Sequence, residues 1–69
     1  MKKYDIRYYF DDENYVTRSI EVEDVYDDND IMHEYTKGDS QTFMDVRGKL
    51  TRVNMNNVFY TKIWESKRK

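Results

Sequence analysis

Polar and hydrophobic positions alternate in two short runs near the start of the chain. The first run, YDIRYYF at residues 4–10, and the second, YVTRSIEVE at residues 15–23, both have a period of two. This period is typical of strands that bury one face. The apolar faces consist of Tyr4, Ile6, Tyr8 and Phe10 in the first run and Val16, Ile20 and Val22 in the second. Because the polar cluster DDEN at residues 11–14 lies between them, the pattern predicts a β-hairpin.

Arg18 interrupts the apolar face of the second run. A long cationic side chain on such a face indicates either an edge strand, where its stem lies along apolar surface and its head group reaches water, or a special role. We expect the edge position.

A short helix is predicted near residues 30–37. The polar stretch at residues 27–30 offers several N-caps, and its carboxylates favour the positive end of a helix dipole. Ile31 and Tyr35 are spaced to share one helix face, and Gly38 is a helix stop. A helix of about two turns is marginal alone, so it needs a sheet beneath it.

Residues 41–64 predict a three-stranded meander with two tight turns. Gly48-Lys49 fits a type II′ turn, and Asn56-Asn57 fits a type I′ turn. The two turns agree on one core face. That face contains Met44, Val46, Val53, Met55, Val58, Tyr60 and Trp64.

The opposite face of this meander is not cleanly polar. It carries four hydrophobic residues, Phe43, Leu50, Phe59 and Ile63. Either the sheet curls so that both faces are partly covered, or these residues form an exposed apolar stripe for a partner.

Together these elements predict an α+β domain of order ββαβββ, with a mostly antiparallel, curved sheet and one short helix; the alternative is a small all-β barrel. We expect a single domain at residues 1–66 and a basic C-terminal tail at residues 67–69. A chain of 69 residues without cysteine has no disulfide or thiolate metal site, so it depends on packing or on a partner, and a homo-oligomer is an option.

Enzymatic and metal chemistry find no support in the sequence, and we expect no catalytic residue, no metal site and no cofactor. In an EF-hand loop starting at Asp24, the third position would be Tyr26 and the sixth Asn29 instead of glycine. His33 is the single histidine, expected to be an exposed helix residue, and no glycine-rich phosphate loop occurs. The chain shows no apolar run of membrane-span length and no signal peptide, so we expect a cytoplasmic protein without membrane contact.

Charge is distributed unevenly along the chain. Residues 1–39 contain twelve acids and five bases, a net −7, whereas residues 40–69 contain two acids and seven bases, a net +5. Seven carboxylates fall within residues 21–34, and no Lys or Arg lies between Arg18 and Lys37. Such a segment is either an ordinary solvated surface or a patch that steers a basic partner to the protein.

In general character the chain resembles small orphan proteins of phages and mobile elements from low-GC bacteria. The likeness lies in composition, without Pro or Cys and rich in Lys, Asn, Asp and Tyr, as in YDIRYYFDDENY and RVNMNNVFYTKIWE. Such proteins often bind and block one host or defence protein. The resemblance therefore implies stoichiometric inhibition by an acidic surface in the host cytoplasm, and it transfers no site residue.

The leading functional prediction is a non-enzymatic protein-interaction module, of the phage inhibitor type, that presents an acidic, nucleic-acid-mimicking surface to a basic, nucleic-acid-binding protein. The predicted partner-binding residues are Glu21, Glu23, Asp24, Tyr26, Asp27, Asp28, Asp30 and Glu34.

Two alternatives use the second half of the chain. Aromatic residues within a basic sheet can stack unpaired bases, which would bind single-stranded nucleic acid directly. The residues for this role are Phe43, Arg47, Lys49, Arg52, Phe59 and Lys62. The acidic half and the pI of about 5.3 make direct nucleic-acid binding the runner-up. The other alternative is a self-assembling accessory protein that uses the apolar stripe.

Overall fold

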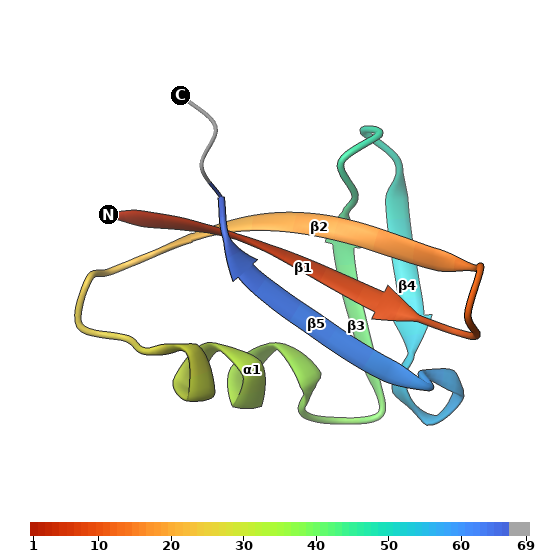
Figure 1. The fold of residues 1–69 in the computed structure, drawn as a ribbon. Helices are drawn as coiled ribbons and strands as arrows, with labels where there is room; N and C mark the ends of the chain where they lie inside the picture. Colours follow the sequence, from red (N-terminus) through yellow and green to blue (C-terminus); the bar gives the residue numbers. More distant parts are fainter. Residues whose placement is uncertain (67–69) are drawn as a thin grey trace.

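The computed structural model describes residues 1–66, so the tail expected at residues 67–69 lies outside the described residues. Within residues 1–66 the elements follow the predicted order ββαβββ (Figure 1). They are β1 (Lys2–Tyr9), β2 (Tyr15–Val22), α1 (Asp28–Thr36), β3 (Ser40–Met44), β4 (Leu50–Asn54), the 3-10 helix η1 (Met55–Asn57) and β5 (Tyr60–Glu65). The α+β prediction is confirmed. The described strands form two unclosed antiparallel sheets, so the all-β barrel alternative is wrong.

The first hairpin forms as the alternation predicts. β1 and β2 pair antiparallel from Lys2↔Val22 to Tyr9↔Tyr15. In the turn, the Asp11 carboxylate accepts hydrogen bonds from the backbone N–H of Glu13 and of Asn14, both at 2.8 Å. Side chains on one face of β1 are buried, namely Tyr4, Ile6 and Tyr8. Phe10 was expected on this face, but it follows the end of β1 and is exposed.

The last strand does not join the predicted meander. β5 pairs with β1 rather than with β4, so the larger sheet has the order β2-β1-β5. Asn56 and Asn57 lie in η1, whose start is capped by the Asn54 side chain accepting from the Asn56 N–H at 3.0 Å. Neither asparagine has the positive φ that a type I′ turn requires. After η1 the chain crosses to the edge of β1 that β2 leaves unpaired. There β5 pairs with β1, and Ile63 lies opposite Ile6.

The β3–β4 hairpin forms, but not in the register of a two-residue turn at Gly48-Lys49, which would place Met44 opposite Val53. Met44 lies opposite Leu50, and Gln41 lies opposite Val53. The connecting loop is longer than a two-residue turn: the Gly48 N–H donates to the Asp45 carbonyl at 2.9 Å, and Gly48 has φ +81°. Because the Asp45 carboxylate accepts from the N–H groups of the following loop, the turn begins at Asp45 and glycine takes its last position instead of its first.

This register reverses the predicted faces of β3. Phe43 is only 6% exposed and belongs to the core, whereas Met44, expected in the core, is 58% exposed. Val46 is also exposed, while Val53 is buried as predicted. The predicted core face was therefore correct for β4 at Val53 and wrong for β3. It was also wrong for Tyr60 and Trp64, which lie on the face of β5 opposite the core.

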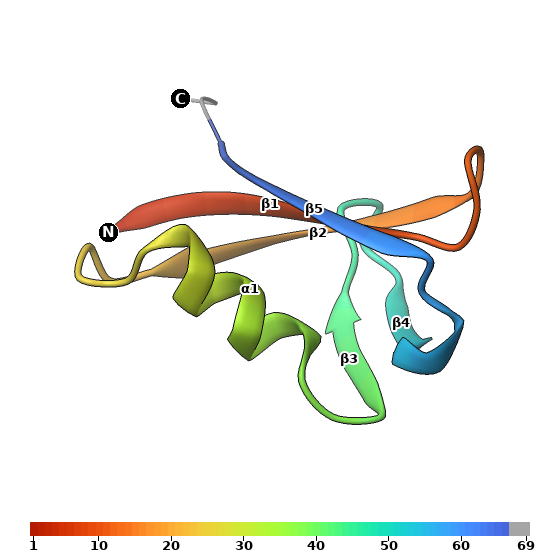
Figure 2. The same ribbon diagram turned by 60° about the horizontal axis from the view of Figure 1, so that its bottom comes forward.

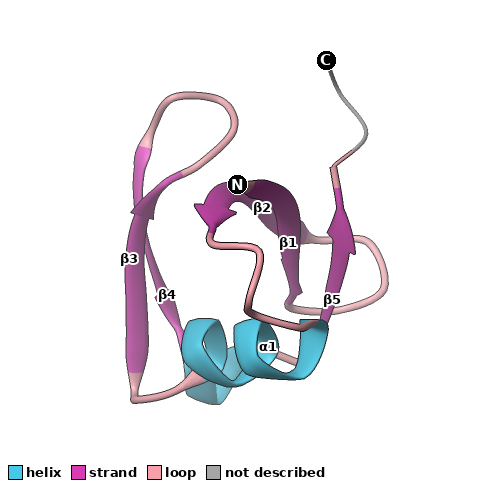
Figure 3. Cartoon of the chain, turned by 90° about the vertical axis from the view of Figure 1, so that its left-hand side faces the viewer, coloured by secondary structure: helices cyan, strands magenta, loops and turns pink. Residues whose placement is uncertain are grey.

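Helix α1 and the β3–β4 hairpin lie on the same side of the three-stranded sheet (Figure 2). In Figure 3 the hairpin and the larger sheet stand on either side, and α1 lies at one end of the space between them. Core side chains come from all three parts: Tyr4, Ile6, Tyr8, Ile31, Phe43 and Val53. The opposite face of the three-stranded sheet is left uncovered by these elements.

The helix starts earlier than predicted because Asp27 is its N-cap. The Asp27 carboxylate accepts from the Asp30 N–H at 2.9 Å, and the Asp30 carboxylate accepts from the Asp27 N–H at 3.3 Å, which completes a capping box. Ile31 is buried, as expected. After the helix, Gly38 has φ +80°, a conformation that favours glycine, so the predicted stop is confirmed.

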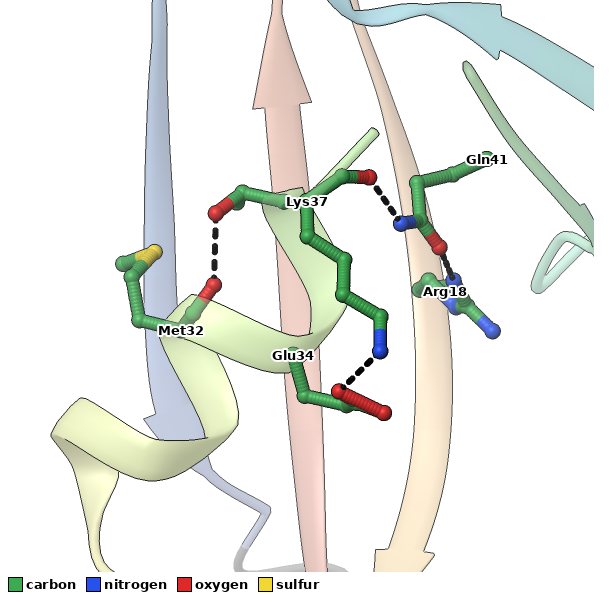
Figure 4. Close-up of polar contacts among 6 residues, drawn as sticks. Arg18, Met32, Glu34, Lys37 and Gln41 are labelled. Atoms are coloured by element: carbon green, nitrogen blue, oxygen red, sulfur yellow. Dashed lines mark hydrogen bonds and ion pairs between the residues drawn. The ribbon is translucent and has the colours of Figure 1, made fainter. Parts of the chain in front are cut away.

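Arg18 lies on β2, an edge strand of its sheet, as predicted. Its guanidinium carbon is 4.9 Å from the centre of the Tyr35 ring and 4.3 Å from that of Phe43. The Arg18 Nη1 donates to the Gln41 side chain at 3.4 Å, and Gln41 donates to the Lys37 carbonyl at 2.8 Å (Figure 4). Arg18 thus connects the sheet, the end of the helix and the hairpin, although its Nε has no hydrogen-bond partner among the described residues.

Candidate functional site

The predicted acidic segment runs from the end of β2 through α1. All eight of its predicted partner-binding residues are exposed: Glu21, Glu23, Asp24, Tyr26, Asp27, Asp28, Asp30 and Glu34. Asp27 and Asp30 also bind backbone N–H groups at the start of the helix, so they have a structural role as well. His33 is an exposed helix residue, as expected.

Part of this segment surrounds a groove of about 700 Å³. The groove lies where the end of β2 meets α1, and four carboxylate residues line it: Glu21, Glu23, Asp30 and Glu34. Asp30 and Glu34 are one helical turn apart, so they occupy the same side of α1. Asp24, Asp27 and Asp28 do not line it. The structure therefore brings five of the eight predicted residues together, these four and Tyr26, and leaves three around the helix start.

The groove also has hydrophobic walls. Val22 from β2 and Ile31 and Tyr35 from α1 contribute to its lining. Carboxylates beside aliphatic and aromatic surface suit a Lys or Arg side chain, because its hydrocarbon stem packs against apolar atoms while its charged head meets the carboxylates.

The described cations of the basic half, within residues 40–66, form no ion pair with these carboxylates. Within residues 1–66 two ion pairs form, and both are local: the N-terminal amine lies 3.6 Å from Asp24, and Lys37 lies 2.8 Å from Glu34. The charge asymmetry of the sequence is thus retained in the fold as a negative surface near α1.

The residues predicted for nucleic-acid stacking do not form one surface. Phe43 is buried in the core and is therefore not on a surface with the other five. Arg52 lies in the two-stranded sheet, where its Nε donates to the Thr42 hydroxyl at 3.3 Å, whereas Lys62 lies in the three-stranded sheet. Arg47 and Lys49 belong to the β3–β4 loop, and Phe59 precedes β5.

The predicted apolar stripe is divided in the same way. Phe43 is in the core and Ile63 is half-buried against it, while Leu50 and Phe59 are exposed on separate parts of the fold. These four residues therefore offer no continuous surface for self-assembly.

The uncovered face of the three-stranded sheet carries an aromatic cluster that the sequence reasoning missed. Tyr15 on β2, Tyr9 on β1 and Tyr60 on β5 lie side by side, because Tyr9 is the register partner of both. On the same face, towards the start of β1, Arg7 lies opposite Lys62 and Asp5 lies opposite Trp64. We call this surface the open face; it consists of Arg7, Tyr9, Tyr15, Tyr60, Lys62 and Trp64.

Rings and cations on the open face are in direct contact. The Tyr9 and Tyr60 rings are stacked with centroids 4.4 Å apart and planes 9° apart, and Tyr9 and Tyr15 are 5.3 Å apart. The Arg7 guanidinium lies 4.2 Å from the Tyr15 ring centre and 5.1 Å from that of Trp64. Lys62 Nζ is 5.7 Å from the ring centres of both Tyr9 and Tyr60. Such cation–π contacts hold both charges at the sheet surface.

Hydrogen bonds orient the Arg7 guanidinium further. Its Nε donates to the Thr17 hydroxyl at 3.0 Å, and its Nη1 donates to the Tyr9 hydroxyl at 3.4 Å. The hydrogen bond to Tyr9 raises the pKa of Arg7 above its ordinary value, so the guanidinium remains charged. The sequence signal for this site was the second alternating series in YDIRYYF. Arg7 and Tyr9 belong to this series, which lies on the face of β1 opposite the core.

The described part of the chain contains no group of three His, Cys, Asp or Glu side chains placed to hold a metal ion. No helix in residues 1–66 has the length and apolar character needed to cross a membrane. Comparisons with protein-family models, with curated proteins and with solved structures found no match for this chain.

Proposed function

We propose that this protein is a non-enzymatic binding module that holds a cationic segment of another protein in the acidic groove between β2 and α1. The observation that carries the proposal is the convergence of carboxylates from two separate elements on one groove with hydrophobic walls. An ordinary solvated surface would account for the exposure of the acids. It would not account for the groove, which has the shape to hold a Lys or Arg side chain.

On this proposal the partner is a protein with a basic surface, including one that binds nucleic acid. The exposed carboxylates of the acidic segment occupy the place that phosphates take on such a protein, so binding blocks it stoichiometrically, as an inhibitor of the phage type would. Negative potential at this end of the molecule speeds the encounter, and the effect weakens as salt is added. Tyr26 at the rim supplies an aromatic contact of the kind that protein interfaces favour.

The test must lower the charge of the groove without removing the helix cap. Asp27 and Asp30 form the capping box, so replacing them would weaken α1 as well as the surface. Glu23→Gln together with Glu34→Gln removes one carboxylate from each side of the groove and leaves the cap intact. The matched control is Asp12→Asn with Glu13→Gln, which changes the net charge equally in the exposed β1–β2 turn.

Binding is measured by NMR titration with an arginine-rich peptide and by affinity capture from a bacterial lysate. We expect peptide-induced shifts around residues 21–23 and 30–35. We also expect binding about tenfold weaker in the groove variant, because each partly exposed charge pair contributes about 0.5–1 kcal/mol. Equal weakening in groove variant and control would show that only net charge matters and would reject the groove.

A further inference from the structure

We infer that the open face of the β2-β1-β5 sheet binds single-stranded nucleic acid, with its aromatic rings stacking on unpaired bases and its cations contacting the phosphates. This surface is separate from the acidic groove. Its strand residues alternate along the sheet with the core residues of β1 and β5, whereas α1 and the β3–β4 hairpin lie on the core side of the sheet (Figure 2).

Tyr9 is buried, with 9% of its surface exposed, but the other aromatic residues of the open face are not part of the buried core. The core lies on the other side of the sheet, around Tyr8, Ile31 and Phe43. An antiparallel sheet with one face packed usually presents polar residues on its solvent face. Here Tyr15 remains 50% exposed and Trp64 37% exposed, with ring surface available to a ligand.

Cations are arranged so that a bound strand meets stacking and charge together. Arg7 and Lys62 are register partners at the middle of the face, each within cation–π distance of exposed or half-buried rings. Arg47 joins them from the β3–β4 loop, which the Val46 N–H fastens to the Thr17 carbonyl of β2 at 3.0 Å. Arg7, Tyr15 and Arg47 line one hollow of about 250 Å³, a place for a phosphate beside an aromatic ring.

Two carboxylates on or near this face, those of Asp5 and Asp45, accept hydrogen bonds from the protein itself. The Asp5 side chain is buried and accepts a hydrogen bond from the Ser19 hydroxyl at 2.6 Å. Asp45 also lines the hollow, but its carboxylate accepts from the backbone N–H groups of Arg47 and Lys49 at 2.9 and 3.0 Å. These carboxylates are therefore turned to partners within the fold.

Single strands fit this chemistry better than duplexes or acidic peptides. A duplex hides the faces of its bases, and an acidic peptide offers charge without the flat rings that match a row of Tyr and Trp side chains. Unpaired bases stack on aromatic rings and on Arg guanidinium planes with little dependence on sequence, while the phosphates contact the cations.

Trp64 makes the test direct because it is the single tryptophan of the chain and lies on the open face. We expect oligothymidylate or oligouridylate to quench its fluorescence at low salt, and a duplex of mixed sequence to have much less effect. With three cations contacting phosphates, the logarithm of the affinity should fall with the logarithm of salt with a slope of about −2.

Two variants and a matched control separate the site from net charge. Lys62→Gln with Arg47→Gln should reduce the slope to about −0.7, and Tyr15→Thr should weaken binding by at least about fivefold through lost stacking. The control, Lys37→Gln with Arg52→Gln, removes the same charge from the end of α1 and from β4 and should retain the affinity within about twofold. Urea unfolding of each variant confirms that it is folded.

The inference is overturned if oligonucleotides leave the Trp64 fluorescence unchanged at low salt. It is also overturned if the control loses as much affinity as the open-face variants, or if polyglutamate binds this face and oligonucleotides do not. The Glu23→Gln, Glu34→Gln variant should bind oligonucleotides at least as well as the wild type. This result distinguishes failure of the open face from failure of the acidic groove.

Discussion

Replacing Tyr8 by Phe removes one buried hydrogen bond and leaves the surrounding packing in place. Tyr8 is 0% exposed, and its hydroxyl donates to the Tyr35 carbonyl at 2.6 Å. Tyr35 is in the last turn of α1, where carbonyl groups lack partners within the helix, so the hydroxyl satisfies one of them. Phe keeps the ring, whose centroid is 5.6 Å from that of Phe43.

The expected loss is about 1.5 kcal/mol of unfolding free energy, because the variant loses the bond and also leaves a carbonyl unpaired. For a domain of this size that lowers Tm by about 10 °C. Urea unfolding followed by circular dichroism at about pH 7 measures it. The matched control is Tyr26→Phe, since Tyr26 is 47% exposed and its change should fall within about 0.5 kcal/mol.

The same variant predicts a distinct pH dependence. Burial raises the pKa of Tyr8 above its ordinary value of 10.0, with the nearby Arg18 opposing the shift. The stability contributed by the protonated Tyr8 hydroxyl is complete below the ordinary pKa, and it is lost as the pH rises through the raised pKa. The stability difference between wild type and Tyr8→Phe should therefore narrow above about pH 10. Equal stability of the two proteins at neutral pH, or a difference that stays constant into the alkaline range, would refute this reasoning.

Three further predictions concern the turns and the helix start. Asp27→Ala should lower the unfolding free energy by about 1 kcal/mol because it removes the capping box, while Asp27→Asn retains most of it; urea unfolding compares the two. Gly38→Ala should lower the unfolding free energy by about 1 kcal/mol, because φ +80° strains a residue with a side chain. The added Cβ would lie 4.0 Å from the Ser40 carbonyl oxygen, so no clash adds to this cost, and an unchanged Tm would contradict the prediction. Asp45→Asn should weaken the acid dependence of stability. The main cause is the hydrogen bond from the backbone N–H of Lys49, which holds the pKa of Asp45 below its ordinary value of 3.8. The contribution of the Asp45 carboxylate to the unfolding free energy is therefore complete above the ordinary pKa and is lost as the pH falls through the lowered pKa. Urea unfolding at a series of acidic pH values tests this.

The locally encoded part of the fold was predictable. The β1–β2 hairpin depends on a period of two and on a turn that Asp11 stabilises, and both are visible within residues 4–23. The helix depends on a cap and a stop that are close in sequence. The acidic residues could also be named beforehand, because their exposure follows from charge. The groove between them could not, since it depends on how α1 packs beside the end of β2.

The rest of the fold depends on choices that short stretches do not determine. Gly48 fits two kinds of turn, and the Asp45 side chain decides between them by binding the loop N–H groups. The strand after Asn57 could pair with β4 or with β1, and it takes the more hydrophobic neighbour, placing Ile63 beside Ile6. The open face joins side chains from strands far apart in sequence, so it could be recognised only once that pairing was known.

The central place of β1 has a consequence for how the protein is made. Its partner β2 follows after a short turn, but β5 must return across nearly the whole described chain, and such distant closures are slow. A nascent chain that has not yet reached Tyr60 leaves one side of β1 with unpaired backbone groups that can capture a strand from another molecule. The pairing of β5 with β1 covers this edge and also brings Tyr60 and Trp64 onto the open face. Protection from aggregation and formation of the open face therefore occur in the same late folding step.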